Sequence, residues 1–124
     1  MLTPNFILLF VDSPAASAAF YADLLKQQPV ETSPTFAMFK LPSNLMLGLW
    51  SKHAAEPKPE VTGGGTELGF AVESAGAVDG LHAEWKERGL RVIQPPTAMD
   101  FGYTFTALDP DGHRLRVFFP NDES

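Results

Sequence analysis

Cysteine is absent from this chain, and its absence excludes several kinds of chemistry. Disulfide bridges, zinc sites built from thiolates and cysteine nucleophiles all require a residue that the sequence does not contain. Clustered positive charge is missing too: charged residues make up an ordinary 19% of the 124 residues, and no cluster of lysine and arginine offsets the formal net charge of −6. A partner with a phosphate backbone, such as a nucleic acid, is therefore not expected.

Long apolar segments are missing as well. The apolar run Phe6–Val11 is too short for a signal or membrane helix, and no basic segment precedes it. Gly63-Gly64-Gly65 lacks the lysine and hydroxyl residue of a phosphate-binding loop. We therefore expect a cytoplasmic protein with no membrane partner. At 124 residues, of which 44% are hydrophobic, the chain has the size and composition of a single globular domain.

The last quarter of the chain has the pattern of a β-hairpin. Aromatic and β-branched residues dominate segments 103–108 and 114–119, and the Asp109-Pro110-Asp111-Gly112 segment between them is typical of a tight turn. A four-residue turn pairs Phe105 with Arg116 and Tyr103 with Phe118. Because side chains alternate along a strand, one face of the sheet would then carry Tyr103, Phe105, Arg114, Arg116 and Phe118. Two arginines among aromatic residues are unusual for a plain core.

The chain also consists of two similar halves. A shift of 61 residues aligns Ser13 with Ser74, and each serine is placed to cap a helix, the first running to about Leu25 and the second to about Arg88. In each half one strand precedes the helix and three follow it, and Pro95-Pro96 is expected to end the strand that begins at residue 91. The sequence thus predicts two βαβββ modules, at about residues 3–51 and 66–120, joined by a linker at residues 52–65.

Several segments of this arrangement carry a family resemblance. They are Val11-Asp12-Ser13, Phe20-Tyr21, Leu24-Leu25, the strand at residues 68–72 and Asp109-Pro110-Asp111-Gly112. On these residues the sequence resembles the vicinal oxygen chelate superfamily of glyoxalases, bleomycin resistance proteins and extradiol dioxygenases. The resemblance implies one α+β domain over residues 1–124, with two tandem βαβββ modules whose curved sheets surround a ligand crevice. It also implies a homodimer.

The resemblance further implies where a metal ion would be held in metal-dependent relatives. The corresponding positions here are Phe6, Gly48, Glu67 and Arg116. A phenyl ring and a glycine offer no ligating side-chain atom, and a guanidinium repels a cation, so Glu67 alone has a suitable oxygen. The sequence therefore predicts a metal-free protein without a cofactor.

Strand alternation, anchored on these positions, predicts which side chains face the crevice and contact a ligand. They are Phe6, Leu8, Gly48, Trp50, Glu67, Tyr103, Phe105, Arg116 and Phe118. In one interpretation Glu67 and Arg116 merely pair while the aromatic rings fill the space. We favour a binding site for a flat organic molecule, because small residues such as Gly48, Gly69 and Ala71 would leave room on that face.

The preferred functional interpretation is a metal-free protein that sequesters a small planar aromatic or drug-like molecule, as bleomycin resistance proteins do. The alternative is a lyase or dioxygenase-like enzyme of the same superfamily, either metal-dependent or using Glu67 as a general base. A dimer without any ligand is a third possibility. The residues alone do not decide whether a reaction is catalysed, which molecule is bound, or whether binding serves antibiotic resistance, transport or metabolism.

Overall fold

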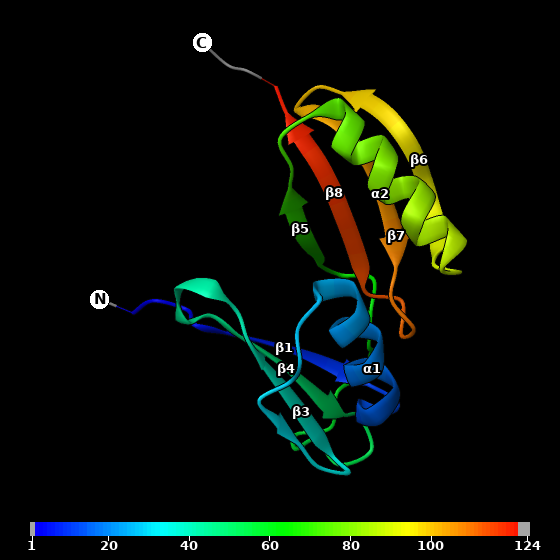
Figure 1. Ribbon diagram of the computed structural model, residues 1–124. Helices are drawn as coiled ribbons and strands as arrows, with labels where there is room; N and C mark the ends of the chain where they lie inside the picture. The colour runs from blue at the N-terminus through cyan, green and yellow to red at the C-terminus, as the bar shows by residue number, and fades with distance from the viewer. Residues whose placement is uncertain (1, 122–124) are drawn as a thin grey trace. The chain divides into compact units, whose positions relative to one another are not determined.

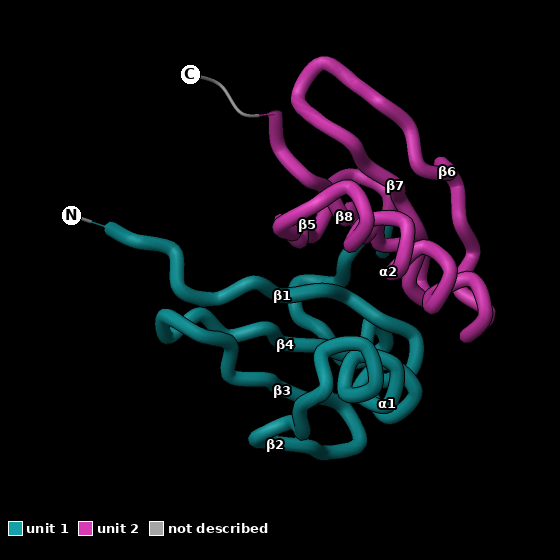
Figure 2. The backbone as a smooth tube through the Cα atoms, turned by 45° about the horizontal axis from the view of Figure 1, so that its top comes forward, with its two compact units in different colours: residues 1–63 teal, residues 64–124 magenta. Residues whose placement is uncertain are grey.

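A computed structural model describes residues 2–121 of the chain. The chain divides into two compact units, of which one ends at Gly63 and the other begins at Gly64 (Figure 2). This boundary lies inside the segment that the sequence analysis assigned to the linker. Each unit has one helix and one four-stranded sheet, so the expected α+β fold of two βαβββ modules is confirmed.

Unit 1 contains β1 (Phe6–Val11), α1 (Pro14–Leu25), β2 (Glu31–Thr32), β3 (Phe36–Lys40), a short 3-10 turn (Pro42–Asn44) and β4 (Met46–Ser51) (Figure 1). The sheet has the order β1-β4-β3-β2, with β1 parallel to β4 and the other pairs antiparallel. Helix α1 begins where expected, because the Ser13 side chain accepts a hydrogen bond from the Ala16 N–H and Pro14 occupies the first turn.

The core of unit 1 lies between α1 and one face of its sheet. Val11, Phe39 and Leu49 are buried on this face, and Tyr21 of α1 is fully buried against it. Their neighbours along each strand point to the opposite face, as the twofold alternation of a strand requires. We call that opposite side, which α1 does not cover, the open face of unit 1.

Unit 2 repeats the plan with β5 (Glu67–Ala71), α2 (Ala75–Glu87), β6 (Arg91–Met99), β7 (Gly102–Leu108) and β8 (Arg114–Pro120). The order of its sheet is β5-β8-β7-β6, and α2 lies across one face (Figure 1). The Ser74 side chain caps α2 by accepting from the Ala77 N–H, as the repeat predicts. Val78 and Trp85 are the buried residues of this helix.

The prediction that Pro95-Pro96 ends a strand is wrong. Strand β6 continues to Met99, with irregular pairing to β7 between Val92 and Gln94 and again between Gln94 and Thr97. β6 is the outermost strand of its sheet. An edge strand tolerates proline, because a missing N–H there can face away from the neighbouring strand.

The pairing predicted for the final hairpin is also wrong, by one residue. The Asp109 N–H donates to the His113 carbonyl at 2.9 Å, so the connecting loop has three residues (110–112) rather than four. Gly112 closes this loop with a positive φ of 85°, the conformation that such three-residue hairpin loops require. In consequence Thr106 pairs with Arg116 and Thr104 with Phe118.

The corrected register moves two predicted ligand contacts to the helix side of the sheet. Phe105 is fully buried, and its ring packs edge-on against Trp85 and His82 of α2, with 5.3 Å between ring centroids in both pairs. The Tyr103 hydroxyl donates to Asp79 of α2 at 2.7 Å. The prediction that Tyr103 and Phe105 share a face with Arg116 is therefore incorrect, and both belong to the layer between sheet and helix.

Candidate ligand-binding site

The open face of unit 2 is the side of its sheet that α2 does not cover. Strand pairing arranges its side chains in three rows across β6, β7, β8 and β5. The first row is Arg91, Leu108, Arg114 and Glu67, the second is Gln94, Thr106, Arg116 and Gly69, and the third is Thr97, Thr104, Phe118 and Ala71. Polar and charged groups therefore fill the first two rows, and an aromatic ring stands in the third.

Glu67 and Arg116 form a two-pronged ion pair on this face. The Arg116 Nε donates to Glu67 Oε1 at 2.9 Å, and its Nη2 donates to Oε2 at 3.0 Å. Arg114 Nη2 reaches the same Oε2 at 2.6 Å. Strand alternation predicted Glu67 and Arg116 on one face, and the structure brings them into direct contact. Paired hydrogen bonds of this type fix the orientation of both side chains.

The third nitrogen of Arg116 is held by residues that the sequence analysis missed. Its Nη1 donates to Gln94 Oε1 at 3.0 Å and to Thr104 Oγ1 at 3.2 Å, and the Thr106 hydroxyl donates to the same Gln94 oxygen at 3.1 Å. Thr104 and Thr106 are fully buried beneath the guanidinium. Gly112, at the last position of the loop, was the available signal for these residues. A glycine there indicates a three-residue loop, which places both threonines on this face.

An aromatic wall stands beside the arginine. The Arg116 Cζ lies 5.6 Å from the ring centroid of Phe101, within the range of a cation–π contact, and the rings of Phe101 and Phe118 meet edge-on at 6.3 Å. The Phe118 ring leans over Gly69, where an added Cβ would lie 3.4 Å from Cε1. Phe118 was predicted for this face. Phe101, from the turn before β7, was not, and it replaces Phe105 as the aromatic partner of Arg116.

Electrostatics keep the Glu67 carboxylate ionised. The hydrogen bond from Arg116 is the main cause that lowers the pKa of Glu67 below its ordinary value of 4.5, and the charges of both arginines add to it, while partial burial opposes them. A general base at neutral pH needs a carboxyl pKa that is raised toward 7. The surroundings of Glu67 act in the opposite direction, which disfavours the general-base role that the sequence left open.

The open face of unit 1 gathers the other predicted contacts. Phe6, Leu8 and Trp50 all lie on it, and the rings of Trp50 and Phe10 are 6.2 Å apart. The expectation that Gly48 leaves room is incorrect, because an added Cβ would lie 2.7 Å from Phe6 and 2.8 Å from Leu8. Side chains thus fill the space above this glycine. The face is apolar, and the Phe6 side of it is solvent-exposed, with 45% of that residue accessible.

The residues at the family's metal positions do not fit a divalent cation. Both oxygens of the Glu67 carboxylate bind guanidinium nitrogens, and Arg116 itself occupies one of the four positions. Phe6 and Gly48 contribute no ligating atom. Within residues 2–121, moreover, no group of three or more histidine, aspartate or glutamate side chains is placed to hold a metal ion.

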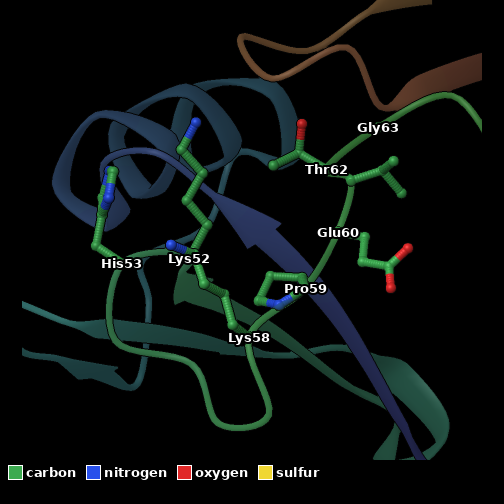
Figure 3. Close-up of a pocket in the computed structure, with 8 residues that line it drawn as sticks. Lys52, His53, Lys58, Pro59, Glu60, Thr62 and Gly63 are labelled. Atoms are coloured by element: carbon green, nitrogen blue, oxygen red, sulfur yellow. The ribbon is translucent and has the colours of Figure 1, made fainter.

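A separate cavity of about 590 Å³ lies in unit 1, beside the segment that follows β4 (Figure 3). Its polar lining includes Lys52, His53, Lys58 and Glu60. His53 Nε2 lies 2.8 Å from Asp12 Oδ1, and this hydrogen bond lowers the pKa of Asp12. The cavity has no aromatic wall and contains charges of both signs, so it suits a flat aromatic molecule poorly. None of the side chains predicted to bind ligand lines it.

Comparison with known proteins agrees with this architecture. The family described as the Glyoxalase/Bleomycin resistance protein/Dioxygenase superfamily matches residues 3–117. The phenazine antibiotic resistance protein EhpR of Enterobacter agglomerans is 34% identical over 119 residues, which cover 94% of this chain and 91% of EhpR. No helix in the described part of the chain is long and apolar enough to cross a membrane.

Solved structures show the same fold. A protein from Agrobacterium tumefaciens with a known solution structure is 54% identical and has a TM-score of 0.90, and the match covers 98% of this chain and 99% of that one. A glyoxalase/bleomycin resistance protein/dioxygenase from Nocardioides is only 20% identical, yet it reaches a TM-score of 0.84 over 100% of this chain and 87% of its own. Sequence and fold together show that this chain belongs to the Glyoxalase/Bleomycin resistance protein/Dioxygenase superfamily.

Proposed function

We propose that this protein binds a planar aromatic small molecule, of the phenazine kind, on the open face of unit 2 and without a metal ion. The observation that carries the proposal is the Glu67–Arg116 pair, which stands at two family metal positions and lies beside Phe101 and Phe118. Aromatic rings with a few fixed polar groups are typical of sites for flat organic ligands. The relationship to a phenazine resistance protein supports the same class of ligand.

Isothermal titration with phenazine and with a saturated ring compound of similar size tests the proposal. We expect phenazine to bind and the saturated compound to bind at least about tenfold more weakly, because only a flat aromatic ring stacks face to face on Phe118 while meeting the nearly perpendicular ring of Phe101 edge-on. Phe118→Ala should weaken phenazine binding about tenfold, in line with the loss of one aromatic contact. Ile93→Ala is the control, because it also truncates an apolar side chain of the same sheet, in β6, but at an exposed position outside the three rows of the open face. Equal affinity for both compounds contradicts the proposal.

Sequestration rather than conversion is the second part of the proposal. The lowered pKa of Glu67 and the unsuitable metal positions both support it. After prolonged incubation with the protein, the ligand should be recovered chemically unchanged, which liquid chromatography with mass detection measures. A product that forms only with intact protein, or stoichiometric metal in protein purified without chelators, would favour the enzymatic alternative instead.

We infer that binding protects the host cell from a toxic aromatic compound. The support is the relative's role, as its name states it, in resistance to a phenazine antibiotic. Cells that express the protein should grow at a higher phenazine concentration than cells that express the Phe118→Ala variant at the same level. If the two strains grow equally well, phenazine binding does not confer resistance, and this inference is contradicted.

We also propose a homodimer, on the strength of the family resemblance and of the apolar open face of unit 1 with its exposed Phe6. An exposed apolar surface of this kind commonly marks an interface. Sedimentation equilibrium should give twice the mass of the chain, and Phe6→Glu should shift the equilibrium toward the monomer. A monomer at all concentrations would contradict this proposal.

A further inference from the structure

The open face of unit 2 carries an excess of positive charge on a chain whose formal net charge is −6. Its first two rows contain Arg91, Arg114 and Arg116 but a single carboxylate, that of Glu67. Asp109, in the adjoining loop, uses its carboxylate to accept the N–H groups of Asp111 and His113, both at 2.8 Å. The open face thus has four charged residues, three positive and one negative, and a formal charge of +2.

The arginines on this face are not equivalent. All three nitrogens of Arg116 have partners, and its side chain is only 16% exposed. Those contacts hold Arg116 in place and leave it few donors for a ligand. Arg116 is therefore a positioning residue, which fixes the Glu67 carboxylate next to Arg114.

Arg114 is held much less completely. Its side chain is 37% exposed, and its one contact among the described residues is the Nη2 ion pair with Glu67 Oε2. Its Nε is buried and lacks a hydrogen-bond partner within the same residues. The partly exposed Arg114 guanidinium thus shares a single carboxylate, that of Glu67, with Arg116, so that one negative charge faces two positive ones on this face.

We propose that Arg114 selects ligands that carry a negatively charged group, so that the ligand class is a planar aromatic acid; this inference rests on the function proposed above. Arg114 and Phe118 lie on the same face of β8, about 13 Å apart along the strand at roughly 3.3 Å per residue. A fused three-ring system that stacks on Phe118 brings a terminal carboxylate within reach of the long Arg114 side chain. Guanidinium and carboxylate form the paired, charge-assisted hydrogen bonds that make such recognition specific.

Three probes of one shape test the inference: phenazine-1-carboxylate, the neutral phenazine-1-carboxamide and unsubstituted phenazine. Isothermal titration at pH 7 and low salt should show the acid binding at least about tenfold more tightly than the amide, as a charge-assisted hydrogen bond predicts. Arg114→Gln should remove this difference while leaving the affinity for the amide within about twofold. Arg114→Lys keeps the positive charge but loses the paired hydrogen bonds, so it should retain only part of the preference.

Arg88→Gln is the control, because Arg88 also pairs with a glutamate, Glu84, at 3.5 Å but caps the C-terminal end of α2, away from the open face. This variant should bind all three probes like the unaltered protein. Preference for the acid should also shrink as salt is raised from about 0.05 to 0.5 M, because screening weakens exposed charge interactions.

The outcomes separate this inference from the function on which it rests. If the acid and the amide bind equally well to the unaltered protein, the inference is overturned while aromatic binding stands. If the folded Arg114→Gln variant still binds the acid more tightly than the amide, Arg114 is not the residue that selects the charged ligand. If none of the three probes binds, both proposals fall. Thermal unfolding of each variant confirms that it is folded. If the glutamine variant does not fold, an undiminished preference for the acid in Arg114→Lys overturns the role of the Arg114 guanidinium.

Discussion

Arg116 is surrounded by a different kind of group on each side: a carboxylate, an amide oxygen, a hydroxyl and an aromatic ring. Each contact supports the others, because the Gln94 oxygen that accepts from Arg116 also accepts from Thr106. In such a network the loss of one member leaves several groups without partners. Arg116 therefore matters to stability as well as to the shape of the site.

Replacing Arg116 by glutamine should lower the free energy of unfolding by about 1–3 kcal/mol, because it removes the paired bonds to Glu67 and the donors to Gln94 Oε1 and Thr104 Oγ1. Arg88→Gln, at an exposed helical ion pair, should cost less than about 0.5 kcal/mol. Urea unfolding followed by circular dichroism measures both values. Similar losses for the two variants would contradict a special role for the network.

Glu67 gives the stability a defined dependence on pH. Its pKa in the folded protein lies below the ordinary value of 4.5, so its stabilising contribution is present above that value and is lost as the pH falls through the folded-state pKa. Compared with Glu67→Gln, the unaltered protein should be more stable at pH 7, and this advantage should disappear as the pH is lowered toward 3. Urea unfolding across this range tests the expectation. Glu84→Gln, which removes a carboxylate on α2, is the control. If the stability advantage of the unaltered protein over Glu67→Gln grows as the pH falls, the prediction is contradicted.

At the scale of elements, the final hairpin shows how far the sequence determines the site. The two strands and the glycine at the turn were predictable from β-branched and aromatic residues around Asp109-Pro110-Asp111-Gly112. The pairing depends on a finer signal, the glycine at the last loop position, because a loop of three residues and one of four differ only in whether Asp109 pairs with His113 across the loop. That single difference exchanges Phe105 for Thr104 and Thr106 on the open face.

Other parts of the fold were predictable to different degrees. Both helices follow from capping serines and apolar spacing, which act within a few residues of sequence. Glu67 and Arg116 were placed on one face by strand alternation, a local rule of the same kind. The contact of Phe101 with Arg116 depends on the turn between β6 and β7, and the filled space above Gly48 depends on how neighbouring side chains lean. Such tertiary details have no local sequence signal.

Gly102, where β7 starts, illustrates a close approach between strands. Its φ is +150°, and a Cβ at this position would collide with the Phe119 carbonyl oxygen and lie 2.9 Å from Pro120 Cα. Gly102→Ala should therefore lower the free energy of unfolding by about 2 kcal/mol or more, since backbone atoms cannot move aside as flexible side chains do.

The matched control for Gly102 is Gly80, which lies inside α2 with no atom within 4 Å of an added Cβ. Gly80→Ala should raise the free energy of unfolding by up to about 1 kcal/mol, because alanine is the better helix former. Chemical denaturation measures the free energy of unfolding of both variants, which should fall for Gly102→Ala and rise for Gly80→Ala. A stabilised Gly102→Ala variant would show that the start of β7 can relax.

At the scale of the whole chain, two tryptophans allow the units to be followed separately, since Trp50 lies in β4 of unit 1 and Trp85 in α2 of unit 2. A ligand on the open face of unit 2 should stabilise the transition that Trp85 reports. At a free ligand concentration a hundred times the Kd, the gain should be about 2.7 kcal/mol. Trp50→Phe, which leaves Trp85 as the only tryptophan, allows fluorescence-detected urea unfolding to measure it. No gain at saturation would contradict binding to unit 2.

The two prolines of β6 have a consequence for the resistance of the protein to aggregation at high concentration. The proposed sequestration, in which no ligand is turned over, requires protein in amounts that match the ligand. Crowded copies of a β-protein tend to aggregate by joining the exposed edges of their sheets. Pro95 and Pro96 lack N–H donors, and the pairing of β6 is irregular on both sides of Gln94. An incoming strand would therefore find no continuous row of hydrogen-bonding groups along this edge.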